Sequence, residues 1–152
     1  MLLSCAEEDD GIYFGETTEI STSAKVSYSD MESNILTLVN DYRKSINLSD
    51  LRTLNIISTI AASHTNYMIE VGEISHDNFS RRAQDLIELA AAKTVAENVA
   101  YGFGTAEGVM TGWLNSEEHK KIIENPVFTH FGISSASNIE GRNYFTLIFI
   151  KK

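Results

Sequence analysis

The spacing of apolar residues changes once along this chain, from a helical repeat to the alternation that is typical of β-strands. Between residues 31 and 123 apolar side chains recur every three or four positions, whereas residues 131–135 and 144–150 follow strand patterns. Residues 138–141, Asn-Ile-Glu-Gly, supply turn chemistry between the two strand segments and predict a β-hairpin. Helices followed by strands predict an α+β domain in which helices cover a small antiparallel sheet.

Five helices are expected before the hairpin. Ser29, Thr105 and Ser116 are placed to cap helix N-termini, and Gly72 is placed to end a helix. The segment Ala96–Ala100 is too short to assign to a helix or a strand. The expected helices cover about residues 31–45, 54–71, 79–92 and 105–114, and a fifth runs from 116 to the stop at Asn125-Pro126.

Length and composition support one folded domain over residues 31–152, which is expected to be a monomer. With 152 residues and a 43% hydrophobic composition the chain can bury a core, and its one cysteine excludes an internal disulfide. The formal net charge is −9, and residues 5–30 hold seven acidic residues against one lysine. A nucleic acid binds to a large basic face, and no basic cluster of that size is present, so nucleic acid is not an expected partner.

Residues 1–5, Met-Leu-Leu-Ser-Cys, resemble the end of a bacterial lipoprotein signal, where the cysteine is acylated. The acidic run Glu7–Asp10 is similar to the export signal that places some lipoproteins of Gram-negative bacteria on the outer surface. Residues 6–30 are rich in Ser, Thr, Glu and Asp without a hydrophobic period, which predicts a flexible spacer. The sequence therefore predicts an outer-membrane or cell-surface lipoprotein with its lipid on Cys5. The alternative is an ordinary chain start with an idle thiol.

Polar motifs lie beside the ends of the expected helices, in the phrases Ser75–Phe79, Ala96–Val99 and Trp113–His119. Together with Gly132–Ser134 they resemble the CAP superfamily, also called the SCP or PR-1-like domain, and most closely its bacterial branch. The resemblance covers about residues 31–152. The matching motifs are His-x-Asn-Phe-x-x-Arg at 76–82, Glu-Asn-Val at 97–99, Trp-x-x-Ser-x-x-His at 113–119 and Phe-x-x-x-Gly-Ile at 128–133.

The resemblance implies a three-layer α-β-α sandwich with a central cleft that is lined by two histidines and one or two acids. Carried over position by position, His76, Glu97 and His119 line this cleft. Helix phase favours Glu117 or Ser116 at the fourth position. The resemblance also implies an extracytoplasmic protein whose cleft takes up a divalent metal, a small hydrophobic molecule or a peptide from a partner protein.

The residue types alone leave three kinds of chemistry open. Two imidazoles and a carboxylate can hold zinc or another divalent metal, with His76, His119 and Glu97 as ligands. An imidazole that is hydrogen-bonded to a carboxylate can instead relay protons, since it is held in one tautomer. The same residues can also form a buried network that stabilises the fold. Because their spacing matches no short ligand motif, only the family resemblance brings them together.

A ligand-binding module is the function we favour from the sequence, and a hydrolase is the alternative. In a metal-assisted hydrolase His76 and His119 hold zinc while Glu97 acts as base on its water. In a serine hydrolase a histidine activates Ser116. The candidate catalytic residues are therefore Glu97, His119 and Ser116. An N-cap position for Ser116, where backbone N–H groups engage its hydroxyl, argues against the serine version. A non-catalytic structural surface protein is the remaining alternative.

Three residues near these motifs are given no role at the cleft. His64 shares an apolar helix face with Tyr67 and Met68, so it is expected to pack in the core. Trp113 is expected to fill the core, and His130 falls in a connector.

Overall fold

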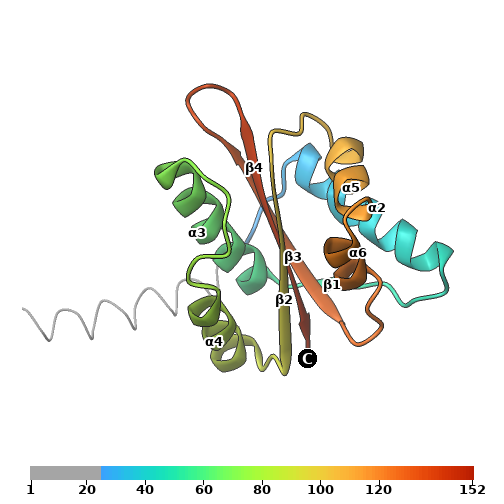
Figure 1. Cartoon of the computed structure of the whole chain (residues 1–152). Coiled ribbons are helices and arrows are strands. Elements are labelled where there is room, and N and C mark those ends of the chain that lie inside the picture. Colours follow the sequence, from blue (N-terminus) through green and yellow to red (C-terminus); the bar gives the residue numbers. More distant parts are fainter. Residues whose placement is uncertain (1–24) are drawn as a thin grey trace, which may run out of the picture.

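A computed structural model describes residues 25–152, so the predicted lipid attachment at Cys5 and most of the predicted spacer lie outside the described residues. In the described part, five helices and four strands follow one another as Figure 1 shows. The elements are, in chain order, α2 (Asp30–Ser45), β1 (Arg52–Thr53), α3 (Asn55–Val71), α4 (Phe79–Ala90), β2 (Thr94–Tyr101), α5 (Ala106–Leu114), α6 (Glu117–Ile123), β3 (His130–Ser137) and β4 (Asn143–Lys151).

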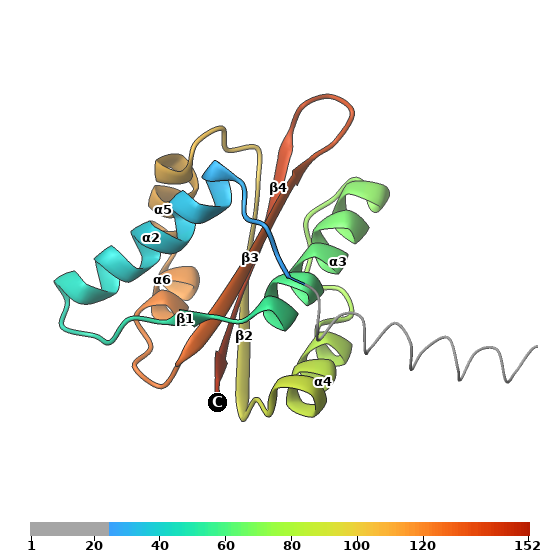
Figure 2. The same cartoon turned by 180° about the vertical axis from the view of Figure 1, so that it is seen from behind.

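The strands form a single sheet in the order β1-β3-β4-β2 (Figures 1 and 2). β3 and β4 form the predicted hairpin, and β2 pairs antiparallel with β4 along its whole length. β1 pairs in parallel with the first two residues of β3, through Arg52 and Thr53. The predicted antiparallel sheet therefore has one short parallel pair, and β2 lies at its opposite edge.

Helices cover both faces of the sheet, which confirms the expected α-β-α sandwich (Figures 1 and 2). One apolar cluster joins α3 and α4 to Ile148 and Ile150 of β4, and a larger cluster joins α2, α5 and α6 to Leu147 and Phe149 of the same strand. β4 is therefore buried on both faces, which explains its unbroken apolar run. Within residues 25–152, none of the helices is long and apolar enough to cross a membrane.

The helix ends follow most of the predicted caps. Ser29 and Glu32 form a reciprocal capping box at the start of α2, and Thr105 accepts a hydrogen bond from Gly108 N at the start of α5. Gly72 ends α3 in the left-handed conformation, with φ of 81°. Ser116 occupies the N-cap of α6, but its side chain makes no capping hydrogen bond. The expectation that backbone N–H groups engage this hydroxyl was therefore wrong.

Strand β2 contains the segment that the sequence left unassigned. Its side chains alternate between the two helical layers: Val95 and Val99 pack with the α3 side, and Ala96 and Ala100 with the α5 side. The two polar residues in the middle of β2, Glu97 and Asn98, are both buried. They interrupt the apolar pattern that would have indicated a strand.

Strand β3 and helix α3 approach each other very closely at Gly132. A Cβ atom at this position would lie 2.5 Å from Ser58 N and 2.8 Å from Ile57 C, both backbone atoms of α3. The Ser58 hydroxyl also accepts a hydrogen bond from Ile133 N at 3.2 Å. Only glycine fits this approach without moving the helix.

Candidate functional site

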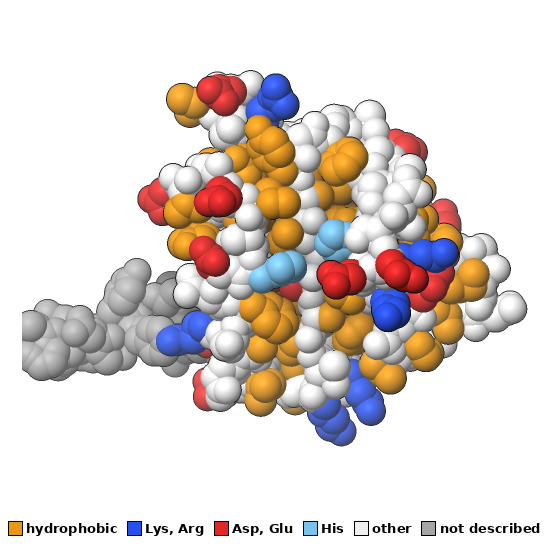
Figure 3. Space-filling model, viewed as in Figure 1, with side chains coloured by type: hydrophobic (Ala, Val, Ile, Leu, Met, Phe, Trp, Pro, Cys, Tyr) orange, Lys and Arg blue, Asp and Glu red, His pale blue; other side chains and the backbone are white. Residues whose placement is uncertain are grey.

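Side chains from several elements converge near the middle of edge strand β2. Glu97 lies on β2, Arg82 on α4, and His76 in the connection between α3 and α4. His119, in α6, is close enough for charge on His76 to affect its ionisation, and Figure 3 shows two histidine side chains close together on the surface. The structure thus joins His76 to Glu97 directly and places His119 alongside.

Glu97 is buried, and both of its carboxylate oxygens are bound. Oε2 accepts a 2.7 Å hydrogen bond from Arg82 Nε. Oε1 accepts hydrogen bonds from Arg82 Nη2 at 2.7 Å and from His76 Nδ1 at 2.8 Å. Arg82 and Glu97 therefore form a bidentate ion pair that is almost fully removed from water, because both side chains are buried.

The hydrogen bond to Glu97 fixes the orientation and the tautomer of His76. A carboxylate that faces a guanidinium only accepts hydrogen bonds, so His76 Nδ1 carries a proton. In the neutral ring the lone pair is then on Nε2, which has no hydrogen-bond partner among residues 25–152. Because the side chain is 52% exposed, His76 presents this nitrogen to solvent in a fixed direction.

The connection that carries His76 is held in place on both sides of that residue. His64 Nε2 lies 2.7 Å from the carbonyl oxygen of Ser75, and the Tyr67 hydroxyl donates to Asp77 Oδ2 at 2.8 Å. Arg82 Nη1 donates to the carbonyl of Asp77 at 2.6 Å. These contacts limit the movement of the His76 backbone, so the imidazole is positioned before any ligand arrives.

His119 carries an unsatisfied polar atom. Its Nδ1 is buried without a hydrogen-bond partner among the described residues, and so is Asn98 Oδ1. Asn98 Nδ2 donates to the carbonyl of His119 at 3.3 Å, so the two residues are adjacent. Burial, and then the nearby His76, lower the pKa of His119, while Glu118 acts in the opposite direction. The Nδ1 atom of this neutral imidazole therefore still lacks a hydrogen-bond partner among the described residues.

A hollow of about 260 Å³ opens beside His76 and Glu97. Ser116, Glu117 and His119 do not line this hollow, and Glu117 is exposed on α6. The other lining residues are apolar: Phe79, Val95, Ala96 and Ile122. The hollow therefore combines an apolar floor with one fixed, hydrogen-bonding imidazole.

The predicted metal ligands are His76, His119 and Glu97, and their arrangement in the structure does not favour a site in which all three bind one ion. Both oxygens of Glu97 are taken by Arg82 and His76. Among the residues that the structure describes, no group of three or more His, Cys, Asp or Glu side chains is arranged to hold a metal ion. Glu97 is better suited to orient His76 through a hydrogen bond than to bind a metal ion itself. Metal binding therefore stays a prediction.

Arg82 is the residue of this site to which the sequence analysis gave no role. The signal was present, because Arg82, Leu86 and Ala90 recur every four residues on the buried face of α4. A charged residue at such a position needs a partner of opposite charge. Helix phase could therefore have predicted a buried carboxylate opposite Arg82, though not which one.

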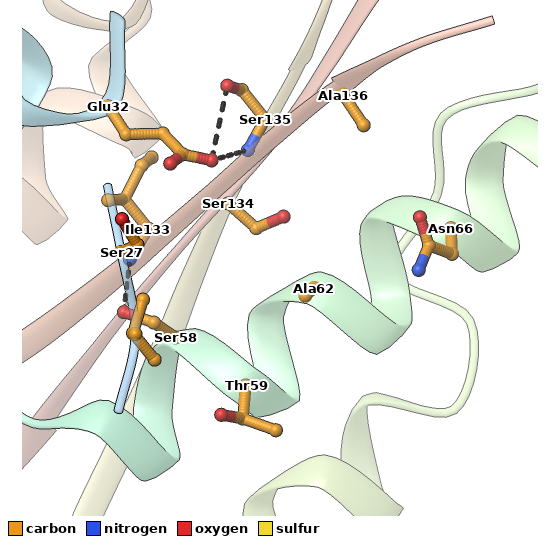
Figure 4. Close-up of a pocket in the computed structure, with 11 residues that line it drawn as sticks. Ser27, Glu32, Ser58, Thr59, Ala62, Asn66, Ile133, Ser134, Ser135 and Ala136 are labelled. Atoms are coloured by element: carbon orange, nitrogen blue, oxygen red, sulfur yellow. Dashed lines mark hydrogen bonds between the residues drawn. The ribbon is translucent and has the colours of Figure 1, made fainter. Parts of the chain in front are cut away.

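A second hollow, of about 350 Å³, lies between α3 and the part of β3 that follows its short pairing with β1 (Figure 4). Two backbone N–H groups along this part of β3 are bound by side chains. Ile133 N donates to Ser58 Oγ at 3.2 Å, and Ser135 N donates to Glu32 Oε2 at 2.7 Å. Ser and Thr hydroxyls dominate the polar part of its lining, and we assign it no function.

Acidification is expected to destabilise the domain through His64 and His119. His64 is 2% exposed, as the core prediction required, and its burial lowers its pKa more than the Ser75 carbonyl and Glu97 raise it. A neutral His64 makes no ion pair with Glu97, although 4.0 Å separates Nε2 from Oε1.

Because both pKa values lie below the unfolded value of 6.5, the unfolded chain takes up protons first. Their stabilising contribution is complete above about pH 6.5 and is lost as the pH falls through the folded pKa values. Urea unfolding at a series of pH values from 8 to 5 measures this loss. The free energy of unfolding should fall by about 1 kcal/mol per pH unit for each group. The His64→Gln variant should show a shallower pH dependence; an unchanged slope contradicts the assignment.

The sandwich and the His76–Glu97 pair on its edge strand define the class of the protein. Residues 36–149 match the model of the CAP family, the cysteine-rich secretory protein family, and the chain belongs to this family. The protein YkwD of Bacillus subtilis is 32% identical over 140 residues, which are 90% of this chain and 53% of that protein. The Bacillus subtilis membrane protein YlbC is 31% identical over 124 residues, 80% of this chain and 34% of its own length. The chain thus spans about half of the length of the first relative and a third of the length of the second.

Solved structures with the same fold come from several bacteria. An outer surface protein of Borrelia burgdorferi matches with a TM-score of 0.74 and 21% identity, over 85% of this chain and 98% of that one. An extracellular protein of Bacillus anthracis that contains an SCP domain matches with a TM-score of 0.70 and 25% identity, over 86% of this chain and 45% of that one. The first of these supports the fold alone.

Proposed function

We propose that this chain is an extracytoplasmic ligand-binding domain of the CAP family, with the hollow beside β2 as its binding site. The name of one solved relative, an extracellular protein that is 25% identical to this chain, supports the location. The proposal includes a lipid on Cys5 and an acidic spacer that tether the domain to the outer membrane or surface of a Gram-negative bacterium. Mass spectrometry of protein from its own host tests the anchor: acylated Cys5 supports it, and an unmodified Cys5 with residues upstream contradicts it.

The observation that carries the binding function is the oriented imidazole of His76 at the edge of an apolar hollow. Glu97 holds the ring, and Phe79, Val95 and Ile122 supply apolar surface next to it. A ligand that fits has an apolar part that is buried against these side chains and a hydrogen-bond donor that meets Nε2. A small hydrophobic molecule and the apolar side chain of a peptide both have this chemistry.

A divalent metal bound by His76 and the neighbouring His119, which does not line the hollow, is the second candidate ligand. Two features favour it: Glu97 binds the second nitrogen of His76, as carboxylates do for metal-binding histidines, and His119 has an unpartnered Nδ1. With His76 and His119 as its only protein ligands, such a metal would complete its shell with water or ligand atoms.

A hydrolase receives less support from this geometry. Glu97 has no free oxygen with which to take a proton from water, because Arg82 and His76 occupy both. The Ser116 hydroxyl is not held by a helix cap, yet no histidine among residues 25–152 is hydrogen-bonded to it. Binding without catalysis is therefore the proposal.

An uncharged apolar dye such as Nile red tests the hollow. We expect its fluorescence to increase with the wild-type protein, and Val95→Thr, which keeps the shape but adds a hydroxyl to the lining, to weaken dye binding roughly tenfold. Val127→Thr changes an exposed apolar residue outside the hollow and serves as the control. Equal affinity for the dye in both variants contradicts the proposed site.

The same titration with zinc, followed by calorimetry, separates the two kinds of ligand. If the metal binds, His76→Ala and His119→Ala should each lower zinc affinity at least about tenfold, while His130→Ala retains it. His76→Ala also removes a hydrogen bond to the buried Glu97, so its melting temperature is measured beside each titration to confirm that the variant is folded. Absence of heat in the wild type excludes the metal version and leaves the dye experiment to decide the binding function.

A further inference from the structure

Three basic side chains gather at one end of the sheet, on β1, on β3 and directly after β4. Arg52 of β1 pairs with His130 of β3, and His130 pairs in turn with Ile150 of β4, two residues before Lys152. Paired residues on neighbouring strands, and residues two apart on one strand, share a face of the sheet. The register therefore places Arg52 beside His130, and Lys152, which directly follows β4, lines the same hollow as both.

These residues surround a hollow of about 390 Å³ that is separate from the hollow beside His76. Hydrogen-bond donors dominate its polar lining: a guanidinium, an ammonium, an imidazole and two hydroxyls. The complete lining is Ser49, Asp50, Arg52, Pro126, Phe128, Thr129, His130 and Lys152.

The two cations of this hollow form no ion pair with any side chain that the structure describes. Within residues 25–152 neither Arg52 nor Lys152 forms an ion pair, although the chain has 21 acidic and 12 basic residues. The lining also contains one acidic side chain, Asp50, which lies 3.8 Å from the exposed Lys44. Burial first, and then the charges of Lys152 and Arg52, lower the pKa of His130. The hollow therefore offers two cations that no ion pair among the described residues holds.

The contacts of Thr129 indicate how His130 faces the hollow. Thr129 Oγ1 accepts a hydrogen bond from Lys152 N at 2.9 Å and lies 2.8 Å from His130 Nδ1. Its alternative acceptor, the carbonyl of Ile150, is farther away at 3.4 Å. The Thr129 hydroxyl therefore donates its proton to His130 Nδ1. The single proton of the neutral His130 ring is then on Nε2. His130 then offers an N–H donor beside the two cations.

We propose that this hollow binds a phosphate group, held by Arg52, Lys152 and the Nε2–H of His130. The planar guanidinium of Arg52 matches two phosphate oxygens, and Lys152 supplies a second charge. The phosphate can belong to a soluble phosphorylated molecule or to a lipid headgroup, which present the same oxygens. The proposal is independent of the ligand at His76, because the two hollows share no residue.

Titration of the full chain with inorganic phosphate, followed by NMR of the histidine ring protons, tests the proposal. Saturating phosphate should raise the pKa of His130, because an anion offsets the two neighbouring cations. Arg52→Gln and Lys152→Gln should each weaken phosphate binding about tenfold. Lys151→Gln removes an exposed neighbour that does not line the hollow, and should bind as the wild type does. Melting temperatures confirm that each variant is folded.

A phosphate titration that leaves His130 unchanged overturns the proposal, as does equal affinity in the wild type and the Arg52→Gln/Lys152→Gln double variant. Co-sedimentation with phosphatidylcholine vesicles that contain phosphatidic acid distinguishes the two sources. Vesicle binding that the double variant loses supports a lipid headgroup. Phosphate binding without vesicle binding supports a soluble phosphorylated ligand.

Discussion

Glu97→Gln is expected to lower the free energy of unfolding by about 3–5 kcal/mol. The substitution keeps the size of the side chain but removes the charge that the buried guanidinium of Arg82 faces at 2.7 Å. A buried cation without its partner is costly, because the protein interior cannot solvate it as water does. Thermal melts should show a fall of roughly 12–20 °C for a domain of this size.

Two further variants show that this effect belongs to the ion pair. Glu140→Gln removes an exposed carboxylate in the β3–β4 turn and should change stability by less than about 0.5 kcal/mol. Arg82→Met/Glu97→Leu removes both charges and should recover much of the lost stability, since a buried pair can often be replaced by apolar groups. A Glu97→Gln protein that melts with the wild type contradicts a buried, paired carboxylate.

Gly132→Ala is expected to destabilise the domain by about 3 kcal/mol or more. The new methyl group would lie 2.5 Å from Ser58 N and 2.8 Å from Ile57 C. Both atoms belong to the backbone of α3, so no side-chain rotation relieves the contact, and the helix has to move away from β3. Because α3 also holds the His76 connection through His64, ligand binding should weaken as well.

Gly104→Ala is the matched control for Gly132. A Cβ at Gly104 meets nothing within 4 Å, and its backbone does not adopt a positive φ. The variant should therefore be neutral or stabilise the domain by about 0.4–1 kcal/mol, through the lower entropy of the unfolded chain. Urea unfolding of both variants measures the difference; similar losses in the two would contradict the proposed close approach.

The helices could be predicted because their apolar period and their caps agree. The buried residues Ile56, Ile60 and Met68 mark one face of α3, and Gly72 ends this helix where the sequence indicates. The hairpin was equally clear, since turn residues separate two strand patterns. Local signals of this kind do not depend on what the rest of the chain does.

The sequence alone could not predict the pairs that build the site. His76 and Glu97 are 21 residues apart and belong to different elements, so only the family resemblance placed them together. The segment 96–100 was too short to assign, and the buried Glu97 and Asn98 interrupt the apolar pattern that would have shown the full length of β2. The ion pair of Arg82 depends on the contact between α4 and the sheet, which no local pattern encodes.

The side chains of Glu32 and Ser58 along the rim of β3 have a consequence for how copies of this domain meet. A strand from another molecule needs both donors and acceptors to extend a sheet, and here the donors of Ile133 and Ser135 are already used. An incoming strand would find only half of its hydrogen bonds. This edge of the sheet therefore resists the addition of a strand from a second copy of the domain.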